Sequence, residues 1–231
     1  MLSGSRSAGW EGNMVESEST EMYLKTILEL EDGDEPVAIA RVAERLGVSA
    51  VSANEMIKRL IERDMVVHTP YKGVRLTGLG RRRAMNVLRR HRLWECFLVE
   101  CLGIAWERSH DLACQLEHAT AEEVTEGLAH FLGNPTVCPH GNRIPARDGA
   151  LDEADTTPLS ELKVGEGGQI ARIYREETPL LDYLAERGIL PGQPVCVEDI
   201  APYNDPLTVR VGSAVVVLGC EIAARILVAV G

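Results

Sequence analysis

Apolar side chains recur every three or four residues through the first part of the chain, a spacing that is typical of amphipathic helices. Residues 20–30 show this pattern and predict the first helix. Residues 37–46 predict a short second helix that ends at Gly47, because glycine readily adopts the left-handed conformation of a helix C-terminus. Residues 49–63 predict a third helix with Ser49 as its N-cap.

A β-hairpin is predicted directly after these helices. Two β-rich runs, M-V-V-H-T and G-V-R-L-T, flank a Pro-Tyr-Lys-Gly turn at residues 70–73. Helix, short turn, helix and hairpin in this order indicate a winged helix-turn-helix. The wing of this DNA-binding unit would carry Lys72 and Arg75.

The rest of the chain divides into a helical part and a β-rich part. Three helices are predicted at residues 80–102, 106–117 and 120–132, the last with a T-A-E-E capping signature. A turn-rich N-P-T-V-C-P-H-G-N-R-I-P segment follows, and the acidic, weakly patterned residues 148–157 indicate a linker. From Pro158 onward, short alternating runs separated by Gly and Pro predict a small β-barrel with one helix at residues 180–187.

Composition excludes several classes of protein. The 231 residues are 45% apolar and 26% charged, which is sufficient for a sizeable core. No apolar run approaches the ~20 residues that span a bilayer, and residues 1–10 lack the apolar region of a signal peptide. The six cysteines include no Cys-x-x-Cys pair. We therefore expect a cytoplasmic protein with no membrane partner, and a disordered Gly/Ser-rich leader at residues 1–18 in which Met14 is an alternative start to Met1.

The charge is distributed unevenly. The chain carries a net charge of −11, yet residues 37–92 hold 13 basic and only four acidic side chains. Such asymmetry indicates a nucleic-acid-facing module joined to an acidic body. A solvated basic helix face explains the charge equally well, and the helix-turn-helix pattern inside the block favours DNA.

Six potential metal ligands form two helical stripes. Residues spaced by three, four, seven or eight positions share one face of a helix. Any one of these residues alone is more often a surface pair or a small buried hydrophobe, but two such stripes that pack together can bind a transition metal. The first stripe holds His91 and Glu95, and the second holds His110, Cys114, Glu117 and His118.

These motifs together resemble the iron-dependent regulators related to the diphtheria toxin repressor, from about Thr20 to Val230. The resemblance rests on T-E-M-Y-L, the winged helix, H-R-L-x-E, H-x-x-A-C-x-x-E-H and N-P-T-x-x-P-x-G-N-x-I-P. The C-terminal barrel resembles the SH3-like domain that this family shares with ferrous-iron transport accessory proteins. The resemblance implies an α+β, multi-domain fold with a winged helix-turn-helix at 19–85, a helical dimerisation and metal-binding domain at 86–147 and an SH3-like domain at 158–231.

The resemblance also implies two metal sites. The primary site would use Met22, Cys114, Glu117 and His118. The ancillary site would use His91, Glu95, His110 and, from the barrel, Glu177. The family's amide-bearing ligand falls at Leu180, which cannot coordinate a metal, so we expect the ancillary site to lack one ligand.

The choice of metal follows from ligand softness. The manganese-selective branch of the family carries Asp at the position of Met22 and Glu at the position of Cys114. Sulfur ligands favour Fe(II) over Mn(II), while Co(II), Ni(II) and Zn(II) are expected to bind in vitro. Because no capping partner is identified before Thr20, we expect the first helix to be flexible until metal closes the primary site.

The implied function is that of an Fe(II)-activated repressor, a homodimer that binds a palindromic double-stranded operator and controls metal-homeostasis genes. Ser49, Val51 and Glu55 would face base edges in the major groove. Phosphate contacts would come from Ser52, Asn54, Lys58, Lys72 and Arg75.

Three alternatives stay open. A manganese-responsive regulator would have the same architecture. A metalloenzyme is disfavoured because both sites look filled by protein ligands and no nucleophile–base pair stands out. A peptide-binding adaptor is disfavoured because the barrel contains only three aromatic residues, Tyr174, Tyr183 and Tyr203.

Overall fold

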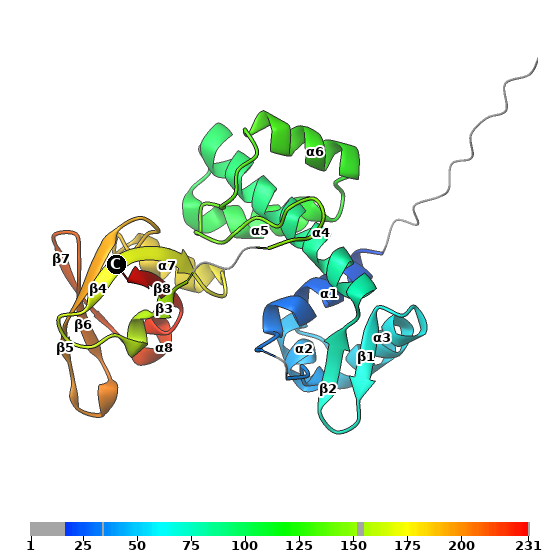
Figure 1. Cartoon of the computed structure of the whole chain (residues 1–231), viewed down its shortest axis with the longest axis horizontal. Coiled ribbons are helices and arrows are strands. Elements are labelled where there is room, and N and C mark those ends of the chain that lie inside the picture. The colour runs from blue at the N-terminus through cyan, green and yellow to red at the C-terminus, as the bar shows by residue number, and fades with distance from the viewer. Residues whose placement is uncertain (1–16, 34, 152–154, 231) are drawn as a thin grey trace, which may run out of the picture.

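The computed structural model describes residues 17–33, 35–151 and 155–230. The predicted leader at 1–18 lies outside these residues except for its last two positions. Figure 1 shows the helix-turn-helix with its wing, the helical bundle of α4 to α6, and the β-rich C-terminal domain. No helix among the described residues is long and apolar enough to span a membrane.

Helix α1 (Glu18–Leu30) buries Leu24 and Ile27 in the core of the DNA-binding domain. The Ser17 side chain caps the helix by accepting a hydrogen bond from the Thr20 backbone N–H at 3.3 Å. The expectation that this helix lacks a capping partner is therefore wrong. A serine three positions before the capped amide is the usual N-cap arrangement.

The two helices of the helix-turn-helix lie within two residues of the bounds that the sequence predicts. Helix α2 (Ile39–Leu46) ends at Gly47, which adopts the left-handed conformation with φ of 64°. Helix α3 (Ala50–Glu62) starts after Ser49, whose hydroxyl accepts from the Ser52 backbone N–H at 3.1 Å. The turn between them therefore follows from one glycine and one serine.

The wing is an antiparallel pair of β1 (Val66–Thr69) and β2 (Gly73–Leu76). Gly73 allows the wing to dock on the entry to α2, because a Cβ at this position would lie only 2.1 Å from the Val37 carbonyl oxygen. Val37 and Val74 exchange backbone hydrogen bonds at 2.8 and 2.9 Å. The wing is thus anchored at its base, and its tip extends away from the domain (Figure 1).

The helical domain consists of α4 (Gly78–Cys96), α5 (Trp106–Glu117) and α6 (Glu122–Phe131), with a π-helical turn at Phe97–Cys101 after α4. The capping role predicted for Thr120 is wrong. Its hydroxyl donates to the Leu116 carbonyl at 2.7 Å and accepts from the Trp94 indole N–H at 2.8 Å. The N-cap of α6 is Ala121, which makes no side-chain capping bond.

The C-terminal domain is a six-stranded antiparallel sheet in the order β3-β8-β4-β5-β6-β7. Its strands are β3 (Thr157–Pro158), β4 (Gly167–Ile173), β5 (Pro194–Ile200), β6 (Leu207–Val211), β7 (Ala214–Leu218) and β8 (Ile226–Val230). Helices α7 (Thr178–Ala185) and α8 (Cys220–Ala223) complete it. The core is aliphatic, as the scarcity of aromatic residues predicts.

Contacts between the domains position the candidate site. Helix α1 packs against α4, α4 packs against α5, and α5 packs against α7. Residues from the DNA-binding domain, the helical domain and the C-terminal domain therefore meet around α4 and α5.

Candidate metal centre

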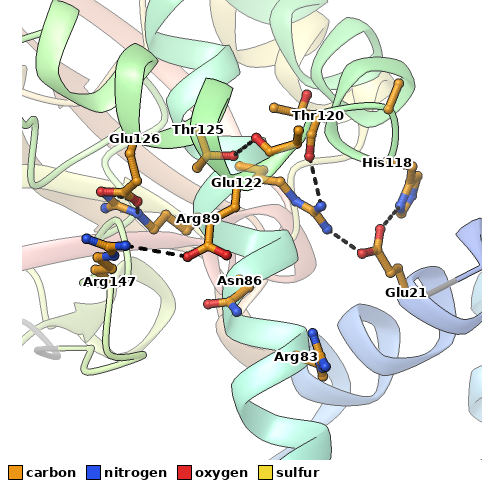
Figure 2. A pocket seen from close by; sticks show the side chains of 13 residues that line it. Glu21, Arg83, Asn86, Arg89, His118, Thr120, Glu122, Thr125, Glu126 and Arg147 are labelled. Carbon is orange, nitrogen blue, oxygen red and sulfur yellow. Dashed lines mark hydrogen bonds and ion pairs between the residues drawn. The ribbon is translucent and has the colours of Figure 1, made fainter. Parts of the chain in front are cut away.

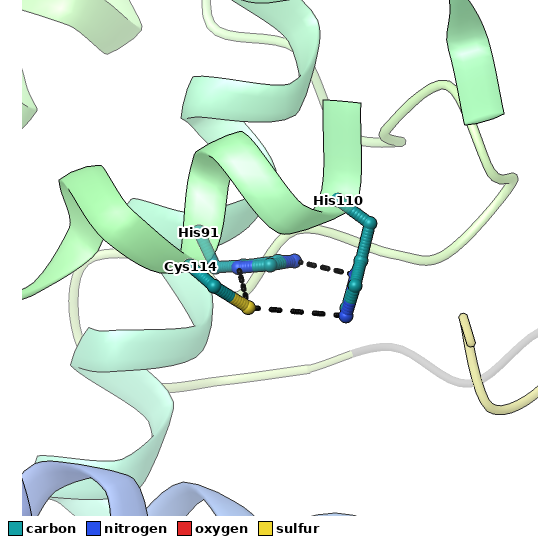
Figure 3. A group of neighbouring side chains, drawn as sticks. All are labelled: His91, His110 and Cys114. Atoms are coloured by element: carbon teal, nitrogen blue, oxygen red, sulfur yellow. Dashed lines mark hydrogen bonds between the residues drawn. The ribbon is translucent and has the colours of Figure 1, made fainter. Parts of the chain in front are cut away.

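The middle of the candidate site is formed by one helical turn of α4 and one helical turn of α5. His91 and Glu95 lie one turn apart on α4, and His110 and Cys114 lie one turn apart on α5. Figure 3 shows the two imidazoles and the thiol converging. The ring centroids of His91 and His110 are 4.7 Å apart. Cys114 Sγ lies 3.9 Å from His91 Nδ1 and 3.8 Å from His110 Nε2.

The carboxylate that the C-terminal domain brings to this cluster is Glu176, which corrects the expectation of Glu177. Glu176 Oε2 lies 3.2 Å from His110 Nδ1. Glu177 accepts a hydrogen bond from Arg45 at 2.9 Å and pairs with Arg225 at 3.3 Å. Glu177 has extended backbone as the N-cap residue of α7, and successive side chains along extended backbone point to opposite sides.

Leu180 is buried in the core of the C-terminal domain, consistent with its inability to act as a ligand. The ancillary site was expected to lack one ligand because of Leu180. Two further side chains, His140 and Cys138, lie near its carboxylates. His140 Nδ1 lies 3.1 Å from Glu95 Oε1 and 3.8 Å from Glu176 Oε1. Cys138 Sγ lies 4.0 Å from Glu176 Oε1.

Sequence reasoning missed Cys138, His140 and Glu176 as candidate ligands. The signal was present in C-P-H, where a Cys and a His stand two positions apart. In the structure both lie on one turn, in which the Gly141 N–H donates to the Cys138 carbonyl at 2.9 Å. Two sets of four potential ligand atoms, each with all its atoms within 4.8 Å of one another, result from this arrangement. They are His91, Glu95, His110 and Glu176, and Glu95, Cys138, His140 and Glu176.

The loop that carries Cys138 and His140 is fixed against strand β4. Ile173 N–H donates to the His140 carbonyl at 3.0 Å. Gly141 permits this contact, since a Cβ there would lie 2.0 Å from the Ala171 carbonyl oxygen. His140 Nε2 lies 3.1 Å from the Trp106 carbonyl, which leaves Nδ1 facing Glu95.

Charges inside the cluster compensate for its burial. Burial opposes ionisation of Glu95, but His140 and His91 hold the pKa of this carboxyl well below its usual range. Burial likewise opposes the charged form of His110, yet hydrogen bonds with Cys114, Glu176 and Glu95 raise the pKa of this imidazole to about 12. The histidines therefore carry protons that balance the carboxylates, and a metal that binds them must displace those protons.

The thiol of Cys114 is already activated as a ligand. Burial raises its pKa, but hydrogen bonds from His110 and His91 and the charge of Lys25 lower the pKa to about 6. A thiolate is the form that binds metals. Cys114 is therefore ionised at neutral pH without any further base.

The four predicted primary ligands do not form one group among the described residues. Glu117 and His118 are in contact, with His118 Nε2 3.1 Å from Glu117 Oε1. Cys114 faces the ancillary histidines instead, and Met22 is 39% exposed on α1.

Helix α1 reaches these ligands through two charged residues that the sequence analysis did not single out. Glu21 Oε2 lies 2.8 Å from His118 Nδ1, and Lys25 Nζ donates to Glu117 Oε2 at 2.7 Å. Figure 2 shows Glu21 between His118 and the arginines of a surface pocket that includes Arg83 and Arg89. Of the predicted primary ligands, His118 lines this pocket.

The predicted DNA contacts all lie on exposed surface. Val51 is 70% exposed near the start of α3, although the Ser49 side chain is also engaged as the N-cap. Asn54 donates its amide to the Ala50 carbonyl at 2.7 Å. The remaining residues of this set, Ser52, Glu55, Lys58, Lys72 and Arg75, are also exposed on α3 and the wing.

The fold combines a helix-turn-helix with a buried cluster of potential metal ligands, and the comparisons with known proteins identify its family. Residues 16–74 match the N-terminal DNA binding domain of the iron dependent repressors. Residues 77–146 match their metal binding and dimerisation domain, and residues 157–230 match the FeoA domain. The chain belongs to the iron-dependent repressor family of metal-dependent transcriptional regulators, and the predicted α+β, multi-domain fold is confirmed.

Individual relatives support this assignment. The iron-dependent repressor IdeR of Mycobacterium tuberculosis is 35% identical in an alignment of 196 residues that covers 78% of this chain and 84% of IdeR. The diphtheria toxin repressor of Corynebacterium diphtheriae is 32% identical over 196 residues, covering 79% and 85% of the two chains. A solved manganese-dependent transcriptional repressor in complex with manganese superposes with a TM-score of 0.85 at 36% identity, covering 92% of this chain and all of the other.

Proposed function

We propose that this protein is an Fe(II)-activated repressor that binds a palindromic operator as a homodimer and controls metal-homeostasis genes. The observation that carries the choice of iron is the thiol of Cys114 among His91 and His110, at 3.9 and 3.8 Å. Thiolate and imidazole ligands favour Fe(II) over Mn(II). Co(II), Ni(II) and Zn(II) fit the same donor set and are expected to activate the protein in vitro.

Metal control of DNA binding is supported by the ties between α1 and the ligands. Glu21 pairs with Arg90 of α4 at 2.6 Å and contacts His118, while Lys25 pairs with Glu117. When bound at Met22, Cys114, Glu117 and His118, a divalent metal supplies direct bonds between α1 and α5. Glu21 and Lys25 must then give up their present partners, so α1 and the helix-turn-helix behind it change position.

A homodimer is supported by the apolar surface of the helical domain. Phe131 is 69% exposed, Val124 52% and Leu102 57% on α6 and after the π-helical turn. Several large exposed apolar side chains on one domain favour a protein interface there. A two-fold dimer would present two α3 helices to successive major grooves, which requires a palindromic site.

Mn(II) is the second candidate metal. The hard carboxylates of Glu95 and Glu176 suit Mn(II) as well as Fe(II), and a related repressor of known structure is described as manganese-dependent. Because the family consists of repressors, we treat the centre as regulatory rather than catalytic.

The test is operator binding as a function of each free metal. A palindromic duplex is first selected from random DNA by the metal-loaded protein, and its affinity is then measured anaerobically with buffered Fe(II), Mn(II), Co(II), Ni(II) and Zn(II). We expect activation by Fe(II) at a free concentration at least tenfold below that of Mn(II). Half-activation by Mn(II) at a lower free concentration than by Fe(II) would contradict the choice of iron. Operator binding that does not change with any metal would contradict the proposed function.

A further inference from the structure

The two sets of potential ligands share both of their carboxylates. One set adds His91 and His110 to Glu95 and Glu176, and the other adds Cys138 and His140. The six side chains form two overlapping sets, and each set by itself supplies four ligands, enough for a tetrahedral site.

The oxygens of Glu176 are divided between the two sides. Oε2 lies 3.2 Å from His110 Nδ1 and 3.9 Å from His91 Nε2. Oε1 lies 3.8 Å from His140 Nδ1 and 4.0 Å from Cys138 Sγ. This carboxylate therefore presents one oxygen to each half of the cluster.

Glu95 also contacts both halves, but through a single oxygen. Its Oε1 lies 2.9 Å from His91 Nε2, 3.4 Å from His110 Nδ1 and 3.1 Å from His140 Nδ1. Its Oε2 is buried without a hydrogen-bond partner among the described residues. The side chain is 0% exposed.

His140 Nδ1 is the second buried atom of this cluster without a hydrogen bond among the described residues, and its contact with Glu95 Oε1 at 3.1 Å is an ion pair. It lies close to Glu95 Oε1 but not in hydrogen-bonding geometry, and it is buried with no other hydrogen-bond partner in the described part of the chain. Buried polar atoms without partners call for an explanation. A metal ion bound between His140 Nδ1 and the carboxylates of Glu95 and Glu176 would give both unpartnered atoms a partner.

We propose that Glu95 and Glu176 bridge two divalent metal ions, one held by His91 and His110 and the other by Cys138 and His140. Carboxylates that bridge two ions about 3.5–4 Å apart are common in dinuclear protein sites. Burial raises the pKa of the Cys138 thiol, so a metal that binds Cys138 must displace its proton. Two divalent ions then bring four positive charges against the three negative charges of Glu95, Glu176 and the Cys138 thiolate. The proposal rests on the proposed function only in that the chain binds divalent metal at this cluster.

The first test needs no substitution. The full chain is loaded anaerobically with Mn(II) to saturation, excess metal is removed, and the electron paramagnetic resonance spectrum is recorded. We expect a broad, exchange-coupled signal, because bridging carboxylates couple the two ions magnetically. A six-line spectrum of isolated Mn(II) alone at saturation would overturn the proposal.

The second test counts bound metal in matched variants. Cys138→Ser combined with His140→Ala should bind one equivalent fewer per chain than the wild type and should lose the exchange-coupled signal. Glu176→Gln should weaken both ions of the pair, and Cys220→Ser, a cysteine outside both sets, should leave the count unchanged. An unchanged metal count in the Cys138/His140 double variant would overturn the second site.

Operator binding measured on the same samples separates the two proposals. If metal activates DNA binding but the coupled signal is absent, the repressor function stands and the bridged pair is wrong. If the coupled signal is present but operator affinity does not change with metal, the bridged pair of ions stands and the proposed function is wrong.

Discussion

Lys25 of α1 and Glu117 of α5 form a buried ion pair with a 2.7 Å contact and side-chain exposures of only 8% and 2%. Lys25 Nζ also lies 3.0 Å from His91 Nδ1. Burial opposes the charged ammonium, but Glu117 holds the pKa of Lys25 above its usual range. Lys25 of the DNA-binding domain therefore contacts Glu117, a predicted primary ligand, and His91, a predicted ancillary ligand.

Replacing Lys25 by Met should destabilise the metal-free protein by about 3 kcal/mol, because breaking a buried pair leaves Glu117 without its main counter-charge. Metal should offset this loss by supplying positive charge at Glu117. Urea unfolding with and without Co(II) measures both effects, with Lys163→Met as the exposed control. A Lys25→Met protein as stable as the wild type without metal would show that the pair contributes nothing.

The stability of the metal-free protein should depend on pH through His118. Burial opposes its charged form, but Glu117 and Glu21 raise the pKa of this imidazole to about 9. A raised pKa in the folded state stabilises the protein fully below about pH 6.5, the unfolded value, and this contribution is lost as pH rises through 9. The difference in unfolding free energy between the wild type and His118→Gln should shrink from pH 6 to pH 9.5. His130→Gln, on the exposed face of α6, serves as the control, and a constant difference would contradict the pairing.

Substitutions at Met22 and Cys114 should separate metal choice from activation. Met22→Asp replaces a soft neutral ligand by a hard anionic one and should shift the response toward Mn(II). A coupling free energy of about 1–3 kcal/mol between metal and DNA binding raises operator affinity by roughly 5–150-fold. Cys114→Ala should remove this gain for every metal. Operator titrations with buffered free Fe(II) and Mn(II) measure both. A Cys114→Ala variant with a normal Fe(II) response would place the primary site elsewhere.

The adjacent pair Glu176 and Glu177 offers an internal control. Glu176→Gln should lower metal affinity by at least tenfold, because it removes the carboxylate nearest His110. Glu177→Gln should leave metal affinity unchanged while weakening the contact with Arg45, an exposed ion pair worth about 0–1 kcal/mol. Equilibrium dialysis with Co(II) compares the two variants. The reverse pattern would restore Glu177 as the ligand.

Alanine at Lys72 and Arg75 should weaken binding to all DNA sequences and flatten its salt dependence. Each phosphate contact contributes about 0.9 to the slope of log K against log salt, so the double variant should lose a slope of about two. Lys163→Ala, an exposed lysine outside the DNA-binding domain, is the matched control. An unchanged slope would remove the wing from the interface.

Much of the fold follows from local pattern. The helix at Trp106–Glu117 has the predicted bounds, and Gly47 and Ser49 end and begin the helices around the turn. The spacing of His91 and Glu95 also places both on one helix face, as predicted. These features depend on residues within a few positions of one another, which is the range that periodicity and capping report.

The sequence by itself determined the helices, the wing and the two ligand stripes on α4 and α5. Only the tertiary structure decided that Glu176 rather than Glu177 faces the cluster, because one residue of extended backbone reverses the side-chain direction. It also decided that Cys138 and His140 join Glu95, since Gly141 lets their loop approach β4, 30 or more residues away in the sequence. Contacts between distant segments depend on how the domains pack, and no local pattern records that packing.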